Sequence, residues 1–284
     1  MALPVFLFYL LFRYIPMIGT VMAFQKFNIA KGLFGSPWIG FNNFITFFNS
    51  YYFARLMRNT VLISLADLLF NFPAPIIFAL LLNEVNRKWF KKAVQTISYM
   101  PYFVSIVVLC GLVIDFCEAG GVISNIASIF LGDQVNLLSK PEYFRTIFVA
   151  SNIWQGLGYG SIVYIAALTN VDQELYEAAV IDGAGRWKQT LHVTIPSIVP
   201  TIVILLILRM GSILDVGYEK VMLLYNPATY ETADVISTFV YRKGFVDYDY
   251  GYSTAVGLFN SVINLCLLTL TNLISRKVGE VSLF

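Results

Sequence analysis

Residues 197–216 read SIVPTIVILLILRMGSILDV, and this stretch decides the class of structure. Only Arg209 and Asp215 carry charge in it, and about 20 mostly apolar residues are needed for a helix to cross a bilayer. Five further apolar runs of similar character lie at about 2–24, 57–83, 93–116, 143–169 and 252–274. The pattern therefore predicts an all-α polytopic membrane protein with six transmembrane helices.

The composition of the whole chain agrees with this. Its 284 residues are 58% hydrophobic and 13% charged, with a mean hydropathy of +0.71, whereas a soluble domain carries about 25% charged residues. A soluble enzyme, a disordered chain and a nucleic-acid-binding protein are therefore poor fits. The run at 2–24 lacks a small-residue cleavage pattern and is long enough to span, so we expect a first transmembrane helix there and no cleavable signal.

Basic residues in the short connections predict the orientation. Arg and Lys are found in segment 84–92, in segment 170–196 and directly after the last span. With six spans these three places fall on one side, which the positive-inside rule makes cytoplasmic. We therefore expect a multi-pass membrane protein with both termini in the cytoplasm. The segments expected outside are 25–56, 117–142 and 217–251.

The outer segment 217–251 contains an expected helix. Glu231 and Asp234 would lie in its first turn, and Arg242 and Lys243 in its last turn before Gly244, which predicts one helix over 231–243. The tyrosine-rich stretch that follows, GFVDYDYGY, admits two interpretations. It is typical of an aromatic belt at the membrane interface, and also of a surface that docks an extracellular protein.

Segment 170–196 reads NVDQELYEAAVIDGAGRWKQTLHVTIP and is unusually apolar for a cytoplasmic connection. Asn170 or Asp172 can cap a short helix, with Glu174 near its positive end. Gly183 and Gly185 then permit a sharp turn. Such a helix either docks into a groove on a partner or lies along the bilayer surface.

A spaced motif in this segment resembles the EAA loop of binding-protein-dependent ABC importer permeases. It consists of Glu177-Ala178-Ala179, three residues, Gly183, nine residues and Val193-Thr194-Ile195-Pro196. The family pattern is EAA, three residues, G, nine residues and I-x-L-P, so this chain substitutes Val and Ile for Ile and Leu. The resemblance covers most of the chain from the first span onward. Residues 217–238 and 274–284 resemble the oligosaccharide and polysaccharide branch of the family.

The resemblance implies a type I ABC importer permease fold in a single transmembrane domain, residues 1–284, with a core at about 57–274. Segment 170–196 would be the coupling loop, and 217–251 a helix-containing extracellular loop. The subunit would move an oligosaccharide by alternating access, with a second homologous permease as heterodimer partner. Two copies of a cytoplasmic ATPase and an extracellular substrate-binding lipoprotein would complete the assembly. It would lie in the lipid of the bacterial plasma membrane, and no nucleic acid is expected as a partner.

The resemblance also implies residue roles in the coupling loop. Glu177 would pair with a basic residue of the ATPase, and Ala178 and Ala179 would let helix and groove approach closely. Gly183 would provide the turn behind them, and Asp182 is expected to belong to the same ATPase-coupling surface. This chain is expected to be no enzyme and to bind no cofactor. Its nearest approach to a phosphate loop, residues 183–190, has Trp187 where the motif requires glycine. ATP and Mg²⁺ are therefore expected on the partner ATPase.

Polar side chains recur at helical spacing inside three of the predicted spans. They are expected either to bind helices together or to line a hydrophilic path for substrate. Asp67 and Arg209 both fall in the outer half of the bilayer by helical rise, so we expect them to pair or to line one vestibule. Asp115, Tyr218 and Glu219 are weaker candidates. The candidate path residues are Asp67, Asn71, Asn152, Gln155, Tyr159, Arg209, Asp215, Asn260 and Asn264.

Two other classes of protein compete with this interpretation. An ion-coupled secondary transporter predicts a cluster of ionisable residues at the midplane and an internal repeat, and neither is clear here. An intramembrane enzyme needs a nucleophile with a base, or a metal site. The single histidine, His192, lies in no predicted span, and the three cysteines have no metal-binding spacing.

Overall fold

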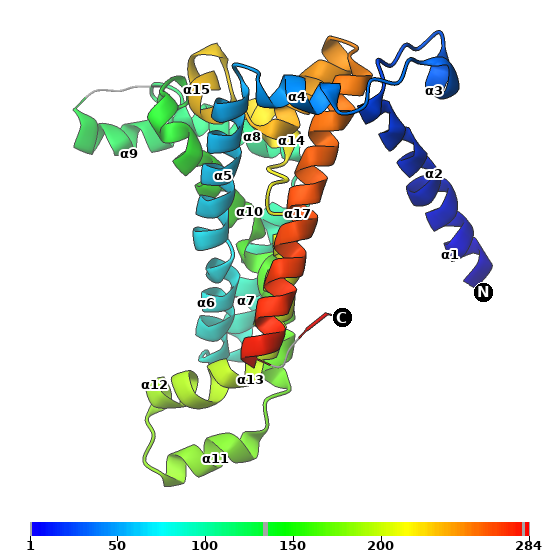
Figure 1. Cartoon of the computed structure of the whole chain (residues 1–284). Coiled ribbons are helices and arrows are strands. Elements are labelled where there is room, and N and C mark those ends of the chain that lie inside the picture. Colours follow the sequence, from blue (N-terminus) through cyan, green and yellow to red (C-terminus); the bar gives the residue numbers. More distant parts are fainter. Residues whose placement is uncertain (1, 133–135, 280–281, 284) are drawn as a thin grey trace.

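Helices dominate the described part of the chain, which is residues 2–132, 136–279, 282 and 283 of this computed structural model. Within these residues extended pairing is limited to an isolated antiparallel bridge between Gln25 and Trp38. Long upright helices form a bundle, with short helices across one end and a projecting helical loop at the other (Figure 1). The predicted all-α fold is confirmed.

Among the described residues, five helical stretches are long and apolar enough to cross a membrane. They are Leu3–Phe24, Phe53–Asn83, Ile106–Ile129, Arg186–Met210 and Tyr250–Lys277. The predicted fourth span coincides with α10 (Pro141–Thr169), a helix of 29 residues. At about 1.5 Å per residue it is long enough to cross, but Asn152 and Gln155 make it less apolar than the other five.

The second and third spans are interrupted. In the second, α5 (Phe53–Phe70) is followed by α6 (Pro73–Asn83), which begins on a proline because a first helical residue needs no N–H. The third was predicted over 93–116 and is instead α7 (Lys88–Tyr99), a 3-10 turn and α8 (Ile106–Cys117). Pro101 lacks the N–H that would continue α7, and Ser105 caps the N-terminus of α8.

The fifth span begins earlier and ends earlier than predicted. It runs from α12 (Arg186–Gln189) through a π-helical turn, η5 (Thr190–Thr194), into α13 (Ile195–Met210). Residues 211–217 are a non-helical loop rather than the end of a span. Their backbone is held from another helix, because Leu214 N–H donates to Asn264 Oδ1 at 3.1 Å.

Segment 217–251, the predicted extracellular loop, also differs from prediction, because the helix expected over 231–243 is broken. It is α15 (Tyr230–Ala233) and α16 (Ile236–Tyr241), which continues into a π turn, η7 (Arg242–Val246). Asp234 lies at the break. Its buried carboxylate binds Arg55 Nη2 at 3.0 Å and Arg242 Nη2 at 2.8 Å, so the break ties this loop to α5. Gly244 lies inside the π turn and does not end the helix.

The remaining elements lie at the two ends of the bundle. In Figure 1, α11 projects beyond α12 and α13 at one end, while α4, α9 and α15 lie at the opposite end. The bounds of the elements not given above are α3 (Gly32–Gly35), α4 (Asn42–Phe48), α9 (Val122–Leu131), η4 (Leu137–Ser139), α11 (Gln173–Ile181), α14 (Tyr218–Leu224), η6 (Pro227–Thr229) and α17 (Tyr250–Gly279). Of the C-terminal stretch 274–284, residues 280, 281 and 284 lie outside the described residues.

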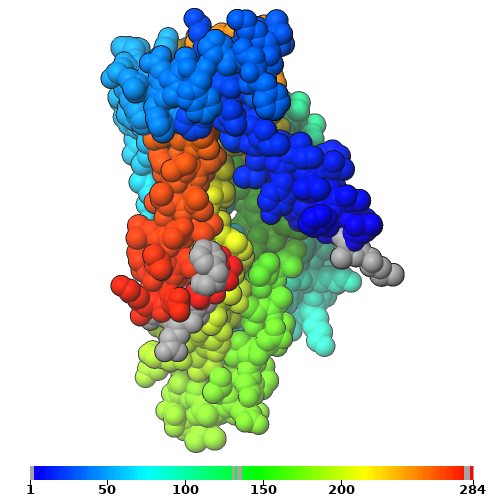
Figure 2. All heavy atoms as spheres, turned by 45° about the vertical axis from the view of Figure 1, so that its right-hand side comes forward, coloured from blue at the N-terminus to red at the C-terminus, as the bar shows by residue number. Residues whose placement is uncertain are grey.

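The first helical stretch stands apart from the bundle. It consists of α1 (Ala2–Tyr9), η1 (Leu10–Tyr14), α2 (Ile15–Met17) and η2 (Ile18–Phe24). It points away from α17 in Figure 1 and forms a separate dark blue ridge in Figure 2. Every side chain from Leu3 to Ile18 is exposed, so this apolar helix is anchored mainly where η2 packs against α17.

The largest hydrophobic cluster lies where α5, α8, α10 and α14 meet. Ile63, Leu109, Phe144 and Val221 are fully buried in it. Three of its members, Ile63, Phe148 and Val216, also line the cavity described below. The packing that stabilises the end of the bundle opposite α11 therefore also shapes that cavity.

We predict that Asp234→Ala lowers the free energy of unfolding by about 3–5 kcal/mol, because removing one partner of a buried ion pair leaves two arginines without their counter-ion. Chemical unfolding of the detergent-solubilised protein measures the change. Glu231→Ala is the matched control. Glu231 is 74% exposed and its pair with Arg58 spans 3.8 Å, so we expect a change of less than about 1 kcal/mol. Equal effects of the two substitutions would contradict the role given to Asp234.

Candidate substrate cavity and coupling surface

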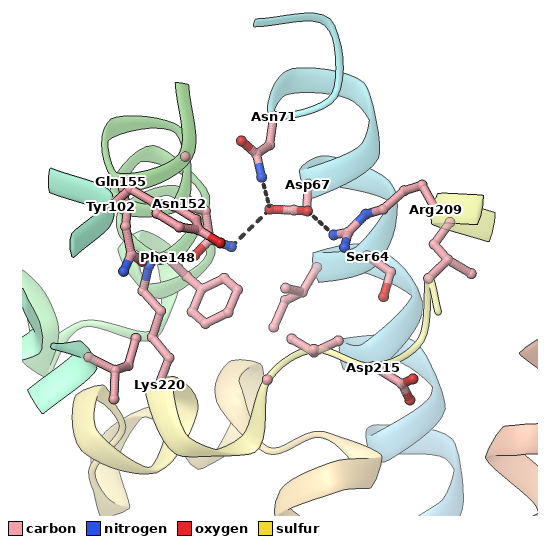
Figure 3. A pocket seen from close by; sticks show the side chains of 16 residues that line it. Ser64, Asp67, Asn71, Tyr102, Phe148, Asn152, Gln155, Arg209, Asp215 and Lys220 are labelled. Atoms are coloured by element: carbon pink, nitrogen blue, oxygen red, sulfur yellow. Dashed lines mark hydrogen bonds and ion pairs between the residues drawn. The ribbon is translucent and has the colours of Figure 1, made fainter. Parts of the chain in front are cut away.

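A cavity of about 370 Å³ lies between α5, α10, the end of α13 and α14 (Figure 3). This volume is within the range of about 300–1,000 Å³ that is usual for ligand sites. Its wall mixes charged, amide and apolar groups. The residues that carry its polar side chains are Ser64, Asp67, Asn71, Tyr102, Asn152, Gln155, Arg209, Asp215 and Lys220.

Asp67 has the most polar partners among the side chains of this wall. Its Oδ1 accepts hydrogen bonds from Asn152 Nδ2 at 2.9 Å and from Asn71 Nδ2 at 3.2 Å, and its Oδ2 forms an ion pair with Arg209. The carboxylate is buried, so these donors replace the water that it loses. The predicted pairing of Asp67 with Arg209 is present, and it joins α5 to α13.

Asp215 belongs to the loop at 211–217 and is held from α17. Its Oδ1 accepts hydrogen bonds from Asn260 Nδ2 at 2.8 Å and from Asn264 Nδ2 at 3.3 Å. The polar stripe predicted in the sixth span therefore fixes the loop, and only Asp215 of these three residues reaches the cavity.

Lys220 is a cavity residue that sequence reasoning missed. It lies on α14, is 5% exposed, donates a hydrogen bond to Asn152 Oδ1 and has its Nζ 5.2 Å from the centre of the Phe148 ring. Burial lowers the pKa of Lys220 to about 8, against the opposing effects of Cys110 and Asp67. The one signal for it in the sequence is its position beside the apolar Val221 in a short helix. Without that signal, a lysine in a predicted outer loop would be expected to face water.

Tyr102 was also missed, and it explains the position of Tyr159. The two rings are stacked, with centroids 3.8 Å apart and planes inclined by 6°. Tyr102 faces the cavity and Tyr159 lies outside the lining. The 3-10 turn after α7 brings Tyr102 there, and the prediction of one continuous helix over 93–116 gave it no such place.

Six of the nine predicted path residues line one cavity, and three support it from outside. Tyr159, Asn260 and Asn264 are the supporting residues, and the weaker candidates Asp115, Tyr218 and Glu219 are also outside the lining. Within the described residues, no group of three or more His, Cys, Asp or Glu could hold a metal ion. The lining residues are Asp67, Asn71, Asn152, Gln155, Arg209 and Asp215.

Segment 170–196, the predicted coupling segment, has the local structure expected of a capped, exposed helix. Glu174 N–H donates to the Asp172 side chain at 3.0 Å at the start of α11. At its end Gly183 has φ +74°, and Ala184 N–H donates to Ala179 O at 2.8 Å, a closure that favours glycine in the left-handed region. Asp172 therefore caps the helix, and Gly183 ends it.

The exposed face of α11 is the surface that the EAA motif occupies. Glu177, Ala178 and Asp182 are exposed, Ala179 is half-buried, and Ile181 is 85% exposed. The loop is tied to the bundle by a hydrogen bond of 2.9 Å between the Tyr176 and Thr194 hydroxyls. An apolar helix held off the body in this way presents a docking surface (Figure 1).

Fold and site together define an integral membrane transport subunit. The family model described as "Binding-protein-dependent transport system inner membrane component" matches residues 71–280. The chain belongs to this family of ABC importer permeases, in a bacterial membrane, and is a transport subunit rather than an enzyme.

Two relatives and one solved structure support the assignment to this family. Protein LplB of Bacillus subtilis (strain 168) is 43% identical, covering 100% of this chain and 90% of the relative. The polygalacturonan/rhamnogalacturonan transport system permease protein YteP of the same organism is 42% identical, covering 100% and 89%. A chain of a bacterial ABC transporter involved in import of the acidic polysaccharide alginate matches with a TM-score of 0.90 at 47% identity, covering 98% of this chain and 94% of that chain.

We predict that reversing either charge of the Asp67–Arg209 pair, by Asp67→Arg or Arg209→Asp, lowers uptake by the assembled importer at least tenfold. Each single change places two like charges together in a buried site. The double variant restores opposite charges, so it should regain a substantial part of uptake. Radiolabelled uptake into proteoliposomes measures all four proteins. A double variant as inactive as the single ones would show that direct pairing is not what the site requires.

Proposed function

We propose that this permease moves an oligosaccharide, and that the cavity around Asp67 is the place where the substrate contacts this subunit. The observation that carries the proposal is a cavity inside the bundle lined by amide, carboxylate, ammonium and tyrosine groups. Sugars present hydroxyl groups and apolar ring faces, which such a wall can bind. The names of the relatives refer to polygalacturonan, rhamnogalacturonan and alginate, which supports a saccharide of this kind.

The coupling segment is proposed to transmit ATP hydrolysis to the cavity. Glu177, Ala178, Ala179, Asp182 and Gly183 would contact a cytoplasmic ATPase present in two copies, which binds ATP and Mg²⁺. The helical stretch that starts at α12 contains Arg209 near its other end, at Met210, which supports a mechanical connection between the two sites. Displacement of α11 by the ATPase would then favour alternating access of the cavity to the two sides.

The other partners are assigned by surface. The exposed first helix supports a second homologous permease as the element that covers it, in a heterodimer. At the opposite end from α11, Phe245, Val246 and Tyr248 are exposed, which supports docking of an extracellular substrate-binding lipoprotein there. One related structure is an alginate transporter in complex with an alginate pentasaccharide-bound periplasmic protein.

The topology is proposed from charge. In Figure 1 the C-terminal end of α17 lies at the same end of the bundle as α11 and α12. Arg186, Lys188, Arg276 and Lys277 are therefore gathered at this end. The positive-inside rule supports a cytoplasmic location for it and for both termini.

The test is to co-purify the chain with its ATPase and measure uptake in the variants Glu177→Ala and Gly183→Val. The first removes the charge that would bind the ATPase. The second strains a residue at φ +74°, at a cost of about 1–3 kcal/mol. We expect both to lower uptake and substrate-stimulated ATP hydrolysis at least fivefold. Glu118→Ala, an exposed glutamate at the opposite end, is the control and should leave both unchanged. Uptake indifferent to both coupling changes would exclude the coupling role.

A further inference from the structure

We propose that Lys220 binds a carboxylate of the substrate, so that this permease selects acidic, uronate-containing oligosaccharides over neutral ones. This inference rests on the proposed function, in which the cavity contacts an oligosaccharide. It adds the chemical class of the sugar and the residue that recognises it.

Lys220 has hydrogen-bonding capacity that the protein does not use. An ammonium group has three donors, and in the part of the chain that the structure describes Nζ has one acceptor, Asn152 Oδ1. No carboxylate lies within 4.0 Å of Nζ among these residues, where the ion pairs involve other cations. Lys220 is 5% exposed, so contact of its side chain with solvent is limited.

The carboxylates of the cavity wall are committed to other groups. Asp67 binds Arg209 and two amides, and Asp215 binds Asn260 and Asn264. Arg209 is neutralised by its own pair with Asp67. Lys220 is therefore the cation of the cavity that lacks a counter-ion, and a buried ammonium without one is costly. A ligand carboxylate would supply that counter-ion.

A second polar group of the wall, the Ser64 hydroxyl, has no hydrogen-bond partner within the described residues. Ser64 is 3% exposed and lines the cavity. A buried hydroxyl without a partner is rare in native structures, and a sugar hydroxyl would complete it. Tyr102 adds an aromatic ring to the same wall (Figure 3). The free groups of the cavity thus match a carboxylate, a hydroxyl and a ring face, which a uronate residue combines.

The test uses two probes that differ in charge and little in size: a short oligogalacturonate and the same oligosaccharide with its carboxylates methyl-esterified. Both are supplied to the complete importer in proteoliposomes, with the binding protein at a concentration that saturates it for each probe. The variants are Lys220→Met, which removes the charge and keeps the length of the side chain, and Lys220→Arg, which keeps the charge. Uptake of each probe is measured against time.

We expect the unmodified importer to favour the oligogalacturonate. Lys220→Met should lower uptake of this acid at least tenfold while uptake of the ester falls less than twofold, and Lys220→Arg should retain at least a third of acid uptake. Continued uptake of the ester also shows that the Met variant has folded and assembled. An equal fall for both probes, no fall for either, or preference for the ester by the unmodified importer would overturn the role of Lys220. Failure of the unmodified importer to take up either probe or any neutral oligosaccharide would instead overturn the proposed function.

Discussion

The carboxylate of Asp67 is the point on which the arrangement of the bundle depends. A charge inside a membrane protein must be neutralised and hydrogen-bonded, because neither lipid nor packed side chains can solvate it. Asp67 meets this requirement with groups from three elements: Asn71 beside α5, Asn152 on α10 and Arg209 on α13. Any large displacement of one helix against the others would separate a charge from its partners. The positions of α5, α10 and α13 are therefore coupled through one residue.

The cavity follows from this constraint and from the early end of α13. Because the helix stops at Met210, residues 211–217 continue as a loop whose polar backbone needs partners from elsewhere. Asn264 supplies one by accepting from Leu214 N–H, and with Asn260 it also holds Asp215. An irregular segment at this depth is tolerated where it lines a polar space. The loop therefore needs the polar cavity beside it, and the cavity needs the loop as part of its wall.

Much of this could be predicted because it depends on local pattern. Apolar length predicted the helices, and spacings of three and four placed Asp67 and Asn71 on one face of the second span. The rarity of charge inside spans predicted the pairing of Asp67 with Arg209, which is confirmed. The EAA spacing predicted the family, which is also confirmed. In each case the physical cause acts within a few residues, or there are so few candidates that the partner is nearly determined.

What could not be predicted depends on contacts between distant segments. The helix expected over 231–243 breaks at Asp234 because Arg55, from another part of the chain, and Arg242 both bind its carboxylate. The end of α13 depends on Asn264, some fifty residues away. Lys220 has the sequence context of an exposed loop residue, and it is buried because α14 packs against α8 and because its side chain reaches Asn152 and Phe148 on α10. Local propensity contains no information about these partners.

The free-standing first helix has a consequence for how the subunit exists in a cell. Since the side chains from Leu3 to Ile18 are exposed, that helix adds little to the folding free energy of the isolated chain. Its apolar side chains are covered by lipid or by another subunit, so its stability depends on the membrane and on assembly more than on packing within the chain. A copy without its partner subunit would therefore hold this helix in the bilayer as a lipid-covered span, attached to the bundle mainly through η2 and α17.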